Sequence, residues 1–276
     1  MKNNLSKIIA VMKHTHFRDI SIYDQSFLLK AFEKRLIATG VYNADDYFND
    51  LEKNSTEAEA FYSSLHITFS QFFRDSLTFA LLEQFILPRL ISSKNDGSEI
   101  RIWSAGCSSG QEAYSMAMLF SDLAEVSGKE LRLRIFATDI SQEVLAAGRA
   151  GEYDQHAVQN VKMKQLNKYF IKQGESYTIV PKLRQYVNFS TYDLLERSSA
   201  NPPESIYGDF DIVICSNLLF YYRSDLQQVI INKLQQAMSV LGYLVTGEAE
   251  KNLVENITKL QMIATSSTVF ENNQRG

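Results

Sequence analysis

The chain contains few of the residues that would support a disulfide framework or a metal centre. Among its 276 residues there are two cysteines, Cys107 and Cys215, which are far apart in sequence. The four histidines are scattered, and none belongs to a metal-ligand pattern such as H-E-x-x-H. We therefore expect two reduced thiols, as is usual for a cytoplasmic protein, and no bound metal.

The sequence also lacks long apolar runs and an excess of basic residues. No apolar run approaches the roughly 20 residues that a membrane helix needs, so we expect no direct membrane insertion. Residues 8–12 are too short for the apolar core of a signal peptide. The 28 Lys and Arg against 32 Asp and Glu give a net charge of −4, which argues against nucleic acid as the main partner. A soluble, cytoplasmic protein is expected.

What is present is enough apolar sequence, 45%, to fill the core of one or two domains. Residues 1–66 show apolar stripes at helical spacing and no strand alternation, which predicts an all-helical domain. A linker and a helix (67–98) follow. Strands then alternate with helices, which predicts a mostly parallel sheet with right-handed crossovers. A β-insertion is expected at about 171–190, where Ser176–Val180 and Leu183–Ser190 alternate like the strands of a hairpin.

The stretch from Glu99 to Ser115 is typical of a strand, a glycine turn and the start of a helix. Gly106 and Gly110 bracket the turn, so that the backbone can bend sharply and approach a ligand closely. A glycine turn between the first strand and a helix is where α/β proteins bind nucleotide-like ligands. A tight turn without any ligand is the alternative interpretation.

Further polar residues follow later strands. The strand Leu131–Thr138 leads to Asp139, whose carboxylate can accept hydrogen bonds from ribose hydroxyls, although a helix cap or a turn is the alternative. The apolar strand Gly208–Cys215 places Asn217 and Tyr221 at the same carboxyl edge. The glycine turn and the acidic strand end fit both a dinucleotide and S-adenosylmethionine.

Four motifs, in the right order, resemble those of the chemotaxis-receptor glutamate methyltransferases, the CheR family. Ser70–Arg74 is similar to T-x-F-F-R, Trp103–Ser115 to W-S-A-x-x-S-x-G-E-E-x-Y-S, Phe136–Ile140 to F-A-[ST]-D-I, and Cys215–Tyr222 to C-R-N-V-[LM]-I-Y-F. The resemblance covers nearly the whole chain. It implies a class I S-adenosylmethionine-dependent methyltransferase with a Rossmann-like, doubly wound α/β fold. The methyltransferase domain would span 67–276 and carry the small antiparallel insertion, after an all-α domain in 1–66.

The resemblance also implies a cofactor, a substrate and a partner. The cofactor is S-adenosyl-L-methionine, the product is S-adenosyl-L-homocysteine, and the methyl group is transferred to protein glutamate side chains. The implied partner is a methyl-accepting chemoreceptor or a related signalling protein, and a monomer is expected. The residues that the resemblance assigns to the cofactor are Ser70, Arg74, Ala105, Gly106, Glu112, Asp139, Asp193, Asn217 and Leu218.

Roles for individual residues follow by matched position. Ser70 and Glu112 would contact the methionine end of the cofactor, and Asp139 the ribose hydroxyls. Asp193 and Asn217 would line the adenosyl pocket. The implied catalytic residues, Arg74 and Tyr221, would lie beside the transferring methyl group.

The chemistry fits these residue types. A glutamate side chain has a reference pKa of about 4.3, so it is an anion at neutral pH and needs no general base. Arg74 can hold the incoming carboxylate with its planar guanidinium, and Tyr221 can orient one oxygen or pack against the sulfonium. Such a site works by positioning and by partial removal of water.

Four features depart from the family's pattern. Ser216 stands where the family has an arginine, and Gly247–Glu250 is G-E-A-E in place of G-H-S-E. Phe27–Leu36 carries fewer arginines than the family's receptor-docking helix, and the insertion is short. Two alternatives therefore stay open, a small-molecule O-methyltransferase and a catalytically impaired module that binds the cofactor. A dehydrogenase would need the full nicotinamide fingerprint, which the sequence lacks.

Overall fold

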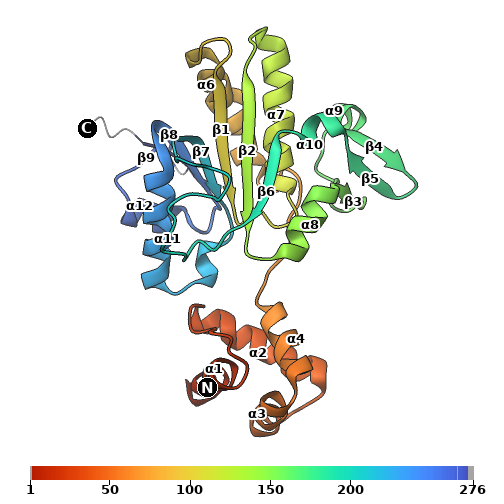
Figure 1. The fold of residues 1–276 in the computed structure, drawn as a ribbon, viewed down its shortest axis with the longest axis vertical. Coiled ribbons are helices and arrows are strands. Elements are labelled where there is room, and N and C mark those ends of the chain that lie inside the picture. The colour runs from red at the N-terminus through yellow and green to blue at the C-terminus, as the bar shows by residue number, and fades with distance from the viewer. Residues whose placement is uncertain (1, 266, 273–276) are drawn as a thin grey trace. The chain divides into compact units, whose positions relative to one another are not determined.

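The computed structural model describes residues 2–265 and 267–272, with the side chains of residues 2 and 3 excepted. The chain divides into two compact units (Figure 1). The smaller unit is formed by Met1–Ile67 and Leu219–Gln228, and the larger by Thr68–Leu218 and Val229–Gly276. The segment Leu219–Gln228, which the sequence prediction assigned to the second domain, thus folds with the N-terminal residues.

The smaller unit is helical. Its helices are α1 (Lys2–His14), α2 (Gln25–Thr39), α3 (Ala44–Lys53), α4 (Ser55–Ser64) and the 3-10 helix η2 (Leu219–Tyr221). Polar caps fix the helix starts: the Asp24 side chain accepts from the backbone N–H groups of Ser26 and Phe27 at the start of α2. The later segment joins through an antiparallel bridge between Tyr23 and Tyr222.

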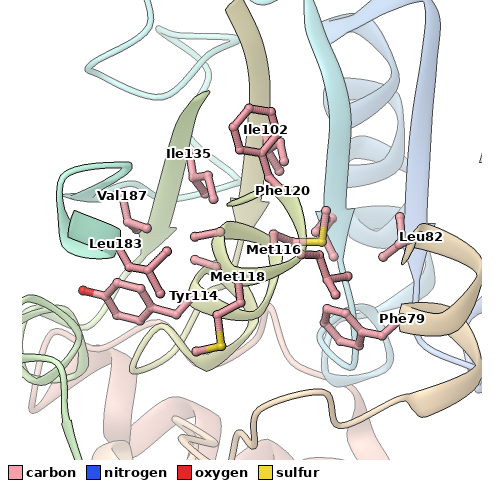
Figure 2. Packing of buried hydrophobic residues seen from close by; sticks show 14 of the residues in the cluster. Phe79, Leu82, Ile102, Tyr114, Met116, Met118, Phe120, Ile135, Leu183 and Val187 are labelled. Carbon is pink, nitrogen blue, oxygen red and sulfur yellow. The ribbon is translucent and has the colours of Figure 1, made fainter. Parts of the chain in front are cut away.

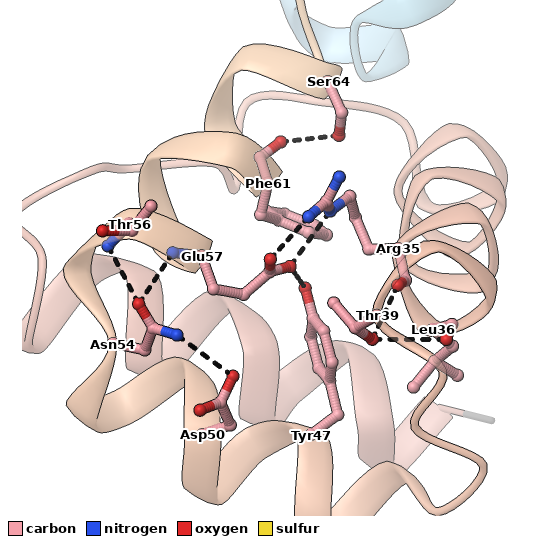
Figure 3. Close-up of polar contacts among 10 residues, drawn as sticks. All are labelled: Arg35, Leu36, Thr39, Tyr47, Asp50, Asn54, Thr56, Glu57, Phe61 and Ser64. Atoms are coloured by element: carbon pink, nitrogen blue, oxygen red, sulfur yellow. Dashed lines mark hydrogen bonds and ion pairs between the residues drawn. The ribbon is translucent and has the colours of Figure 1, made fainter.

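A buried polar network connects three of these helices (Figure 3). The guanidinium of Arg35 on α2 donates to the carboxylate of Glu57 on α4, with Nε at 3.0 Å from Oε1. The hydroxyl of Tyr47 on α3 donates to the same carboxylate at 2.6 Å. Burial and the neighbouring carboxylate raise the pKa of Tyr47, so the phenol stays a donor. Because one carboxylate on α4 accepts hydrogen bonds from side chains on α2 and α3, the network connects these three helices.

The larger unit is built on a seven-stranded sheet. Its strands are β1 (Glu99–Ala105), β2 (Arg132–Asp139), β6 (Val187–Thr191), β7 (Phe210–Cys215), β8 (Met238–Thr246), β9 (Gln261–Met262) and β10 (Val269–Glu271). The strand order is β6-β2-β1-β7-β8-β10-β9. The pairs from β6 to β8 are parallel, whereas β10 runs antiparallel to both neighbours. The predicted doubly wound, mostly parallel sheet is confirmed.

Most helices of the larger unit cover this sheet or connect its strands, whereas α9 (Met163–Tyr169) lies beside the small insertion (Figure 1). The helices are α5 (Ser76–Leu81), the π-helix η1 (Leu82–Ile86), α6 (Leu87–Ser93), α7 (Gln111–Ser127), α8 (Gln142–Ala150), α9 (Met163–Tyr169), α10 (Pro181–Arg184), α11 (Ser224–Ala237) and α12 (Lys251–Ile257). The first residues of α11 belong to the smaller unit. No helix in the described ranges is long and apolar enough to cross a membrane.

The main core lies between α7 and one face of the sheet. Strand residues that alternate toward this face, such as Ile102 and Ile135, are fully buried. Figure 2 shows them together with Met116 and Phe120 from α7. The intervening residue Trp103 packs against Phe210 instead, with ring centroids 5.6 Å apart. Both faces of β1 are therefore buried, as expected for a central parallel strand.

A small antiparallel sheet in the order β3-β5-β4 forms the insertion: β3 (Glu152–Tyr153), β4 (Phe170–Gln173) and β5 (Ser176–Ile179). The predicted hairpin of Ser176–Val180 with Leu183–Ser190 was wrong. The hairpin partner of β5 is β4, which precedes it. The stretch Leu183–Ser190 begins in the helix α10 and reaches β6 only at Val187. The strand β6 is an edge strand of the large sheet, and its Phe189 ring packs closely on Gly110 and Gly148.

The path of the chain through the large sheet locates the place for a ligand. From β1 the chain moves outward to β2 and β6, and then returns to the other side of β1 to form β7 and β8. Loops at the carboxyl ends of β1 and β7 therefore diverge in opposite directions. In open α/β sheets ligands bind in the crevice at this switch point.

Candidate functional site

The turn after β1 is held by the end of β2. The backbone N–H groups of Gly106 and Cys107 both donate to the carbonyl oxygen of Thr138, at 2.8 Å. Gly106 and Gly110 have φ angles of 75° and 87°, and Ser108 has 50°. Such left-handed conformations favour glycine, which explains the two glycines of the motif.

Asp139, at the end of β2, fixes two loops through one carboxylate. Its Oδ2 accepts from the backbone N–H of Ser108 at 3.0 Å, and its Oδ1 accepts from Ser141 N at 3.0 Å. Asp139 therefore has the turn role that was the alternative interpretation of the sequence. The residue is only half-buried, and a carboxylate has about four acceptor positions, so capacity remains for hydroxyl donors.

Residues after β7 meet the glycine turn. A Cβ atom placed on Gly106 would lie 2.7 Å from Leu218 Cδ2, so a larger residue would displace the Leu218 side chain. Asn217 adopts a φ of 60°, which is uncommon for a residue other than glycine. The structure therefore brings Ala105, Gly106, Asn217 and Leu218 together at the switch point.

Glu112 lies in the first turn of α7 and accepts a hydrogen bond from Ser104 Oγ at 2.6 Å. Burial raises the pKa of its carboxyl to about 7. The hydrogen bond from Ser104 opposes that rise, the nearby Glu250 carboxylate adds to it, and Ser216 and Arg74 oppose it. A carboxyl group with a pKa near neutral pH at the switch point is a candidate partner for an ammonium group.

The segment that carries Ser70 and Arg74 is tied to the glycine turn and to α7. Ser108 Oγ donates to the carbonyl oxygen of Thr68 at 2.8 Å, and Phe73 N donates to Ser115 Oγ at 3.1 Å. Phe73 has a φ of 51°. These contacts place the half-buried Ser70 between two anchored positions.

Aromatic contacts fix the same segment from the other side. Phe72 is fully buried, with its ring centroid 4.8 Å from that of Tyr153 and 5.3 Å from that of Phe170. Arg74 is exposed, and its guanidinium lies 5.3 Å from the centroid of the Phe69 ring. The positive charge of Arg74 opposes the rise in the pKa of the Glu112 carboxyl.

Asp193 lies two positions beyond β6 and is exposed. Its Oδ1 accepts from Leu195 N at 2.8 Å, and the preceding Tyr192 N donates to the carbonyl oxygen of Asp139 at 3.0 Å. Asp193 therefore borders the site next to Asp139. Tyr221 belongs to the smaller unit, where its carbonyl oxygen accepts from Asp24 N at 2.8 Å and its ring lies 4.7 Å from that of Phe27.

Sequence reasoning missed three polar residues of the site. Ser104 and Ser216 act on Glu112, and Glu250 contacts the loop after β7. One signal was available for Ser104, which is a polar residue at the carboxyl end of β1, the end of a parallel strand at which ligands bind. Glu250 is the last residue of the G-E-A-E stretch and keeps the family's glutamate, but its contact with residues about 30 positions earlier has no local signature.

The two cysteines are free and buried, and burial raises the pKa of both thiols. Across residues 2–265 and 267–272, no cluster of three or more potential metal ligands occurs. The polar groups of the site are thus carboxylates, hydroxyls, an amide and one guanidinium.

The family model that matches this chain is described as "CheR methyltransferase, SAM binding domain" and covers residues 68–269. A chemotaxis protein methyltransferase of Pseudomonas aeruginosa is 35% identical over 195 residues, covering 68% of this chain and 69% of the relative. That of Escherichia coli is 31% identical over 258 residues, covering 87% of this chain and 85% of the relative.

Two further similarities carry less weight. An uncharacterized 104.1 kDa protein of Rhodobacter capsulatus is 30% identical over 244 residues, and the chain spans 25% of its length. Among solved structures, the N-methyltransferase NodS from Bradyrhizobium japonicum, in complex with S-adenosyl-L-homocysteine, has a TM-score of 0.40 at 15% identity, covering 77% of this chain and 98% of that one.

Proposed function

The chain belongs to the CheR methyltransferase family, and from this premise we propose that it methylates glutamate side chains of a chemoreceptor or a related signalling protein. It is an S-adenosylmethionine-dependent methyltransferase. The single observation that supports the proposal best is the convergence of Glu112, Asp139 and the turn Gly106–Gly110 at the switch point of the sheet.

The residues at the switch point fit S-adenosylmethionine. Glu112 offers a partly buried carboxylate for an ammonium group, and Asp139 offers acceptor positions for two hydroxyls. The backbone of Gly106 is free of a side chain at the point where Leu218 approaches it. We propose that these residues, with Ser70, Ala105, Asp193 and Asn217, hold the cofactor. When bound, the cofactor supplies an electrophilic methyl group on its sulfonium.

Arg74 is the proposed anchor for the substrate carboxylate. It is exposed, borders the site, and is held by Phe69 and by the fixed backbone of Phe73. A guanidinium can hold a carboxylate through two parallel hydrogen bonds. Because a glutamate is already ionised at neutral pH, the protein needs to orient it and exclude water, and no base is required. The assignment of Tyr221 as a second catalytic residue stays a prediction.

The smaller helical unit is the proposed docking domain for the protein substrate. The names of the P. aeruginosa and E. coli relatives connect them to chemotaxis, which favours a chemoreceptor as the partner. A monomeric state, a cytoplasmic location and the predicted domain boundary after residue 66 stay predictions.

Methyl transfer to a receptor tests the proposal. The purified protein is incubated with methyl-labelled S-adenosylmethionine and the cytoplasmic fragments of chemoreceptors from the same genome. We expect label on the receptor that alkali releases as methanol, as a glutamate methyl ester requires. Label that resists alkali, or transfer to small molecules alone, would contradict the proposal.

A further inference from the structure

Glu250 lies just before α12 and is 1% exposed. Its Oε2 accepts from the backbone N–H of Asn217 at 2.8 Å and from that of Gly247 at 3.0 Å. Its Oε1 accepts from the backbone N–H of Leu218 at 2.7 Å. One buried carboxylate thus joins the loop after β8 to the loop after β7.

The loop after β7 has an uncommon backbone conformation. Asn217 has a φ of 60°, a conformation that costs free energy for a residue with a side chain. A Cβ atom on Gly247 would lie 2.6 Å from Asn217 Nδ2, so the amide of Asn217 packs directly on the Gly247 backbone. Asn217 is therefore held from two sides by the segment Gly247–Glu250.

The contact requires a carboxylate rather than an amide. Three N–H donors converge on the two oxygens of Glu250, whereas glutamine has one acceptor oxygen and one NH₂ donor group. A glutamine at this position would direct its NH₂ at one or two backbone N–H groups. A buried donor would then lose its acceptor, which is costly.

We propose that Glu250 is a positioning residue for the cofactor, which acts by holding Asn217 and Leu218 in the conformation that receives the adenosyl group. This inference rests on the proposed function, because the roles of Asn217 and Leu218 are part of it. Within the G-E-A-E stretch the role belongs to Glu250. Glu248 is exposed and forms an ion pair with Lys251.

Calorimetric titration of Glu250→Gln with two ligands tests the inference, with Glu248→Gln as the matched control. The ligands are S-adenosylhomocysteine and 5′-methylthioadenosine, which lacks the amino acid portion. We expect Glu250→Gln to weaken both ligands by about tenfold or more, since a backbone donor loses its charged acceptor. Glu248→Gln should bind both as the wild type does. Glu112→Gln should weaken S-adenosylhomocysteine and spare 5′-methylthioadenosine.

Hydrogen exchange supplies a readout that does not depend on ligands. The amides of Asn217 and Leu218 should exchange slowly in the wild type and faster in Glu250→Gln, while amides within β7 keep their protection. A variant that was only less stable would lose protection throughout the sheet.

The outcomes separate the inference from the proposed function. Wild-type protein that binds neither ligand contradicts both. If the wild-type protein binds both ligands and Glu250→Gln binds them with the same affinity, the inference is overturned and the proposed function still stands. If Glu250→Gln does not fold, Glu250→Asp takes its place, because its shorter side chain also cannot reach all three donors. Full affinity and unchanged protection in Glu250→Asp would overturn the inference.

Discussion

At the scale of single residues, the site is a set of charged groups whose positions are fixed by backbone contacts. Asp139 illustrates this, because the same carboxylate that is proposed to bind ribose hydroxyls also holds the N–H groups of Ser108 and Ser141. The sequence offered a ligand role and a turn role as alternatives. In the structure one side chain has the acceptor capacity for both.

Arg74→Ala should separate binding from turnover. Arg74 is exposed, and its guanidinium contacts Phe69 rather than the residues of the glycine turn. We therefore expect the affinity for S-adenosylhomocysteine to stay within about twofold, and methyl transfer to fall by about 100-fold or more, as for other removed transition-state donors. Calorimetry and the alkali-labile methylation assay measure the two effects.

The control for this variant is Arg132→Ala, at the opposite end of β2, where the side chain is also exposed. Arg132→Ala should keep the wild-type affinity for S-adenosylhomocysteine and the wild-type rate of methyl transfer. Near-normal methyl transfer by Arg74→Ala would show that another group anchors the substrate.

The raised pKa of Glu112 predicts that the affinity for the cofactor depends on pH. Burial raises its pKa to about 7, so below that pH the carboxyl is protonated before the ligand arrives. If the carboxylate form binds the ammonium group, the affinity for S-adenosylhomocysteine should fall as the pH falls below 7, by up to about tenfold per unit. Titrations between pH 6 and pH 8 measure this slope.

The raised pKa of Glu112 makes folding stability depend on pH in the direction opposite to ligand affinity. A carboxyl whose pKa is raised on folding stabilises the protein below its unfolded value of 4.5, and this contribution is lost as the pH rises through about 7. Glu112→Gln should remove both dependences. A pH-independent affinity in the wild type would show that Glu112 does not face the ammonium group.

At the scale of elements, helix α7 anchors the loop that carries Arg74. Ser115 on α7 accepts from Phe73 N, and its hydroxyl donates to the Gln111 carbonyl oxygen at 2.7 Å. Ser115→Ala leaves the N–H of Phe73 without this acceptor and should cost about 1–3 kcal/mol of stability. Because Arg74 is the next residue, we expect turnover to fall about tenfold with little change in cofactor affinity.

The matched control is Ser121→Ala, a buried serine further along the same helix. It should lose stability without the loss of turnover. Thermal unfolding and steady-state kinetics on the two variants distinguish them. Equal turnover in both would contradict the positioning of Arg74 through α7.

Local patterns explain which elements could be predicted. The turn between β1 and α7 follows from two glycines between an apolar strand and an amphipathic helix, and the structure places them at left-handed φ angles. The hairpin could not be predicted correctly, because alternation in residues 187–191 fits an edge strand as well as an insertion. The strand pairs with β2, and its Phe189 packs against Gly110 and Gly148, which are distant in sequence.

At the scale of the whole molecule, the chain forms two compact units, and the boundary between them is not a single point in the sequence. Leu219–Gln228 returns to the N-terminal helices, where Tyr222 pairs with Tyr23. The sequence motif Cys215–Tyr222 therefore contributes Asn217 and Leu218 to the larger unit and Tyr221 to the smaller one. Because the motif is one continuous stretch of sequence, it gave no sign that its residues are divided between two units.

The measurement that tests the central claim most directly is calorimetric titration of the wild-type protein with S-adenosylmethionine and S-adenosylhomocysteine. We expect micromolar binding of both ligands, tighter for the product, and clearly weaker binding by Asp139→Ala because the hydroxyl acceptor is lost. Absence of binding to either ligand by folded wild-type protein would contradict a cofactor site at the switch point between β1 and β7. The methyltransferase function would then fail with it.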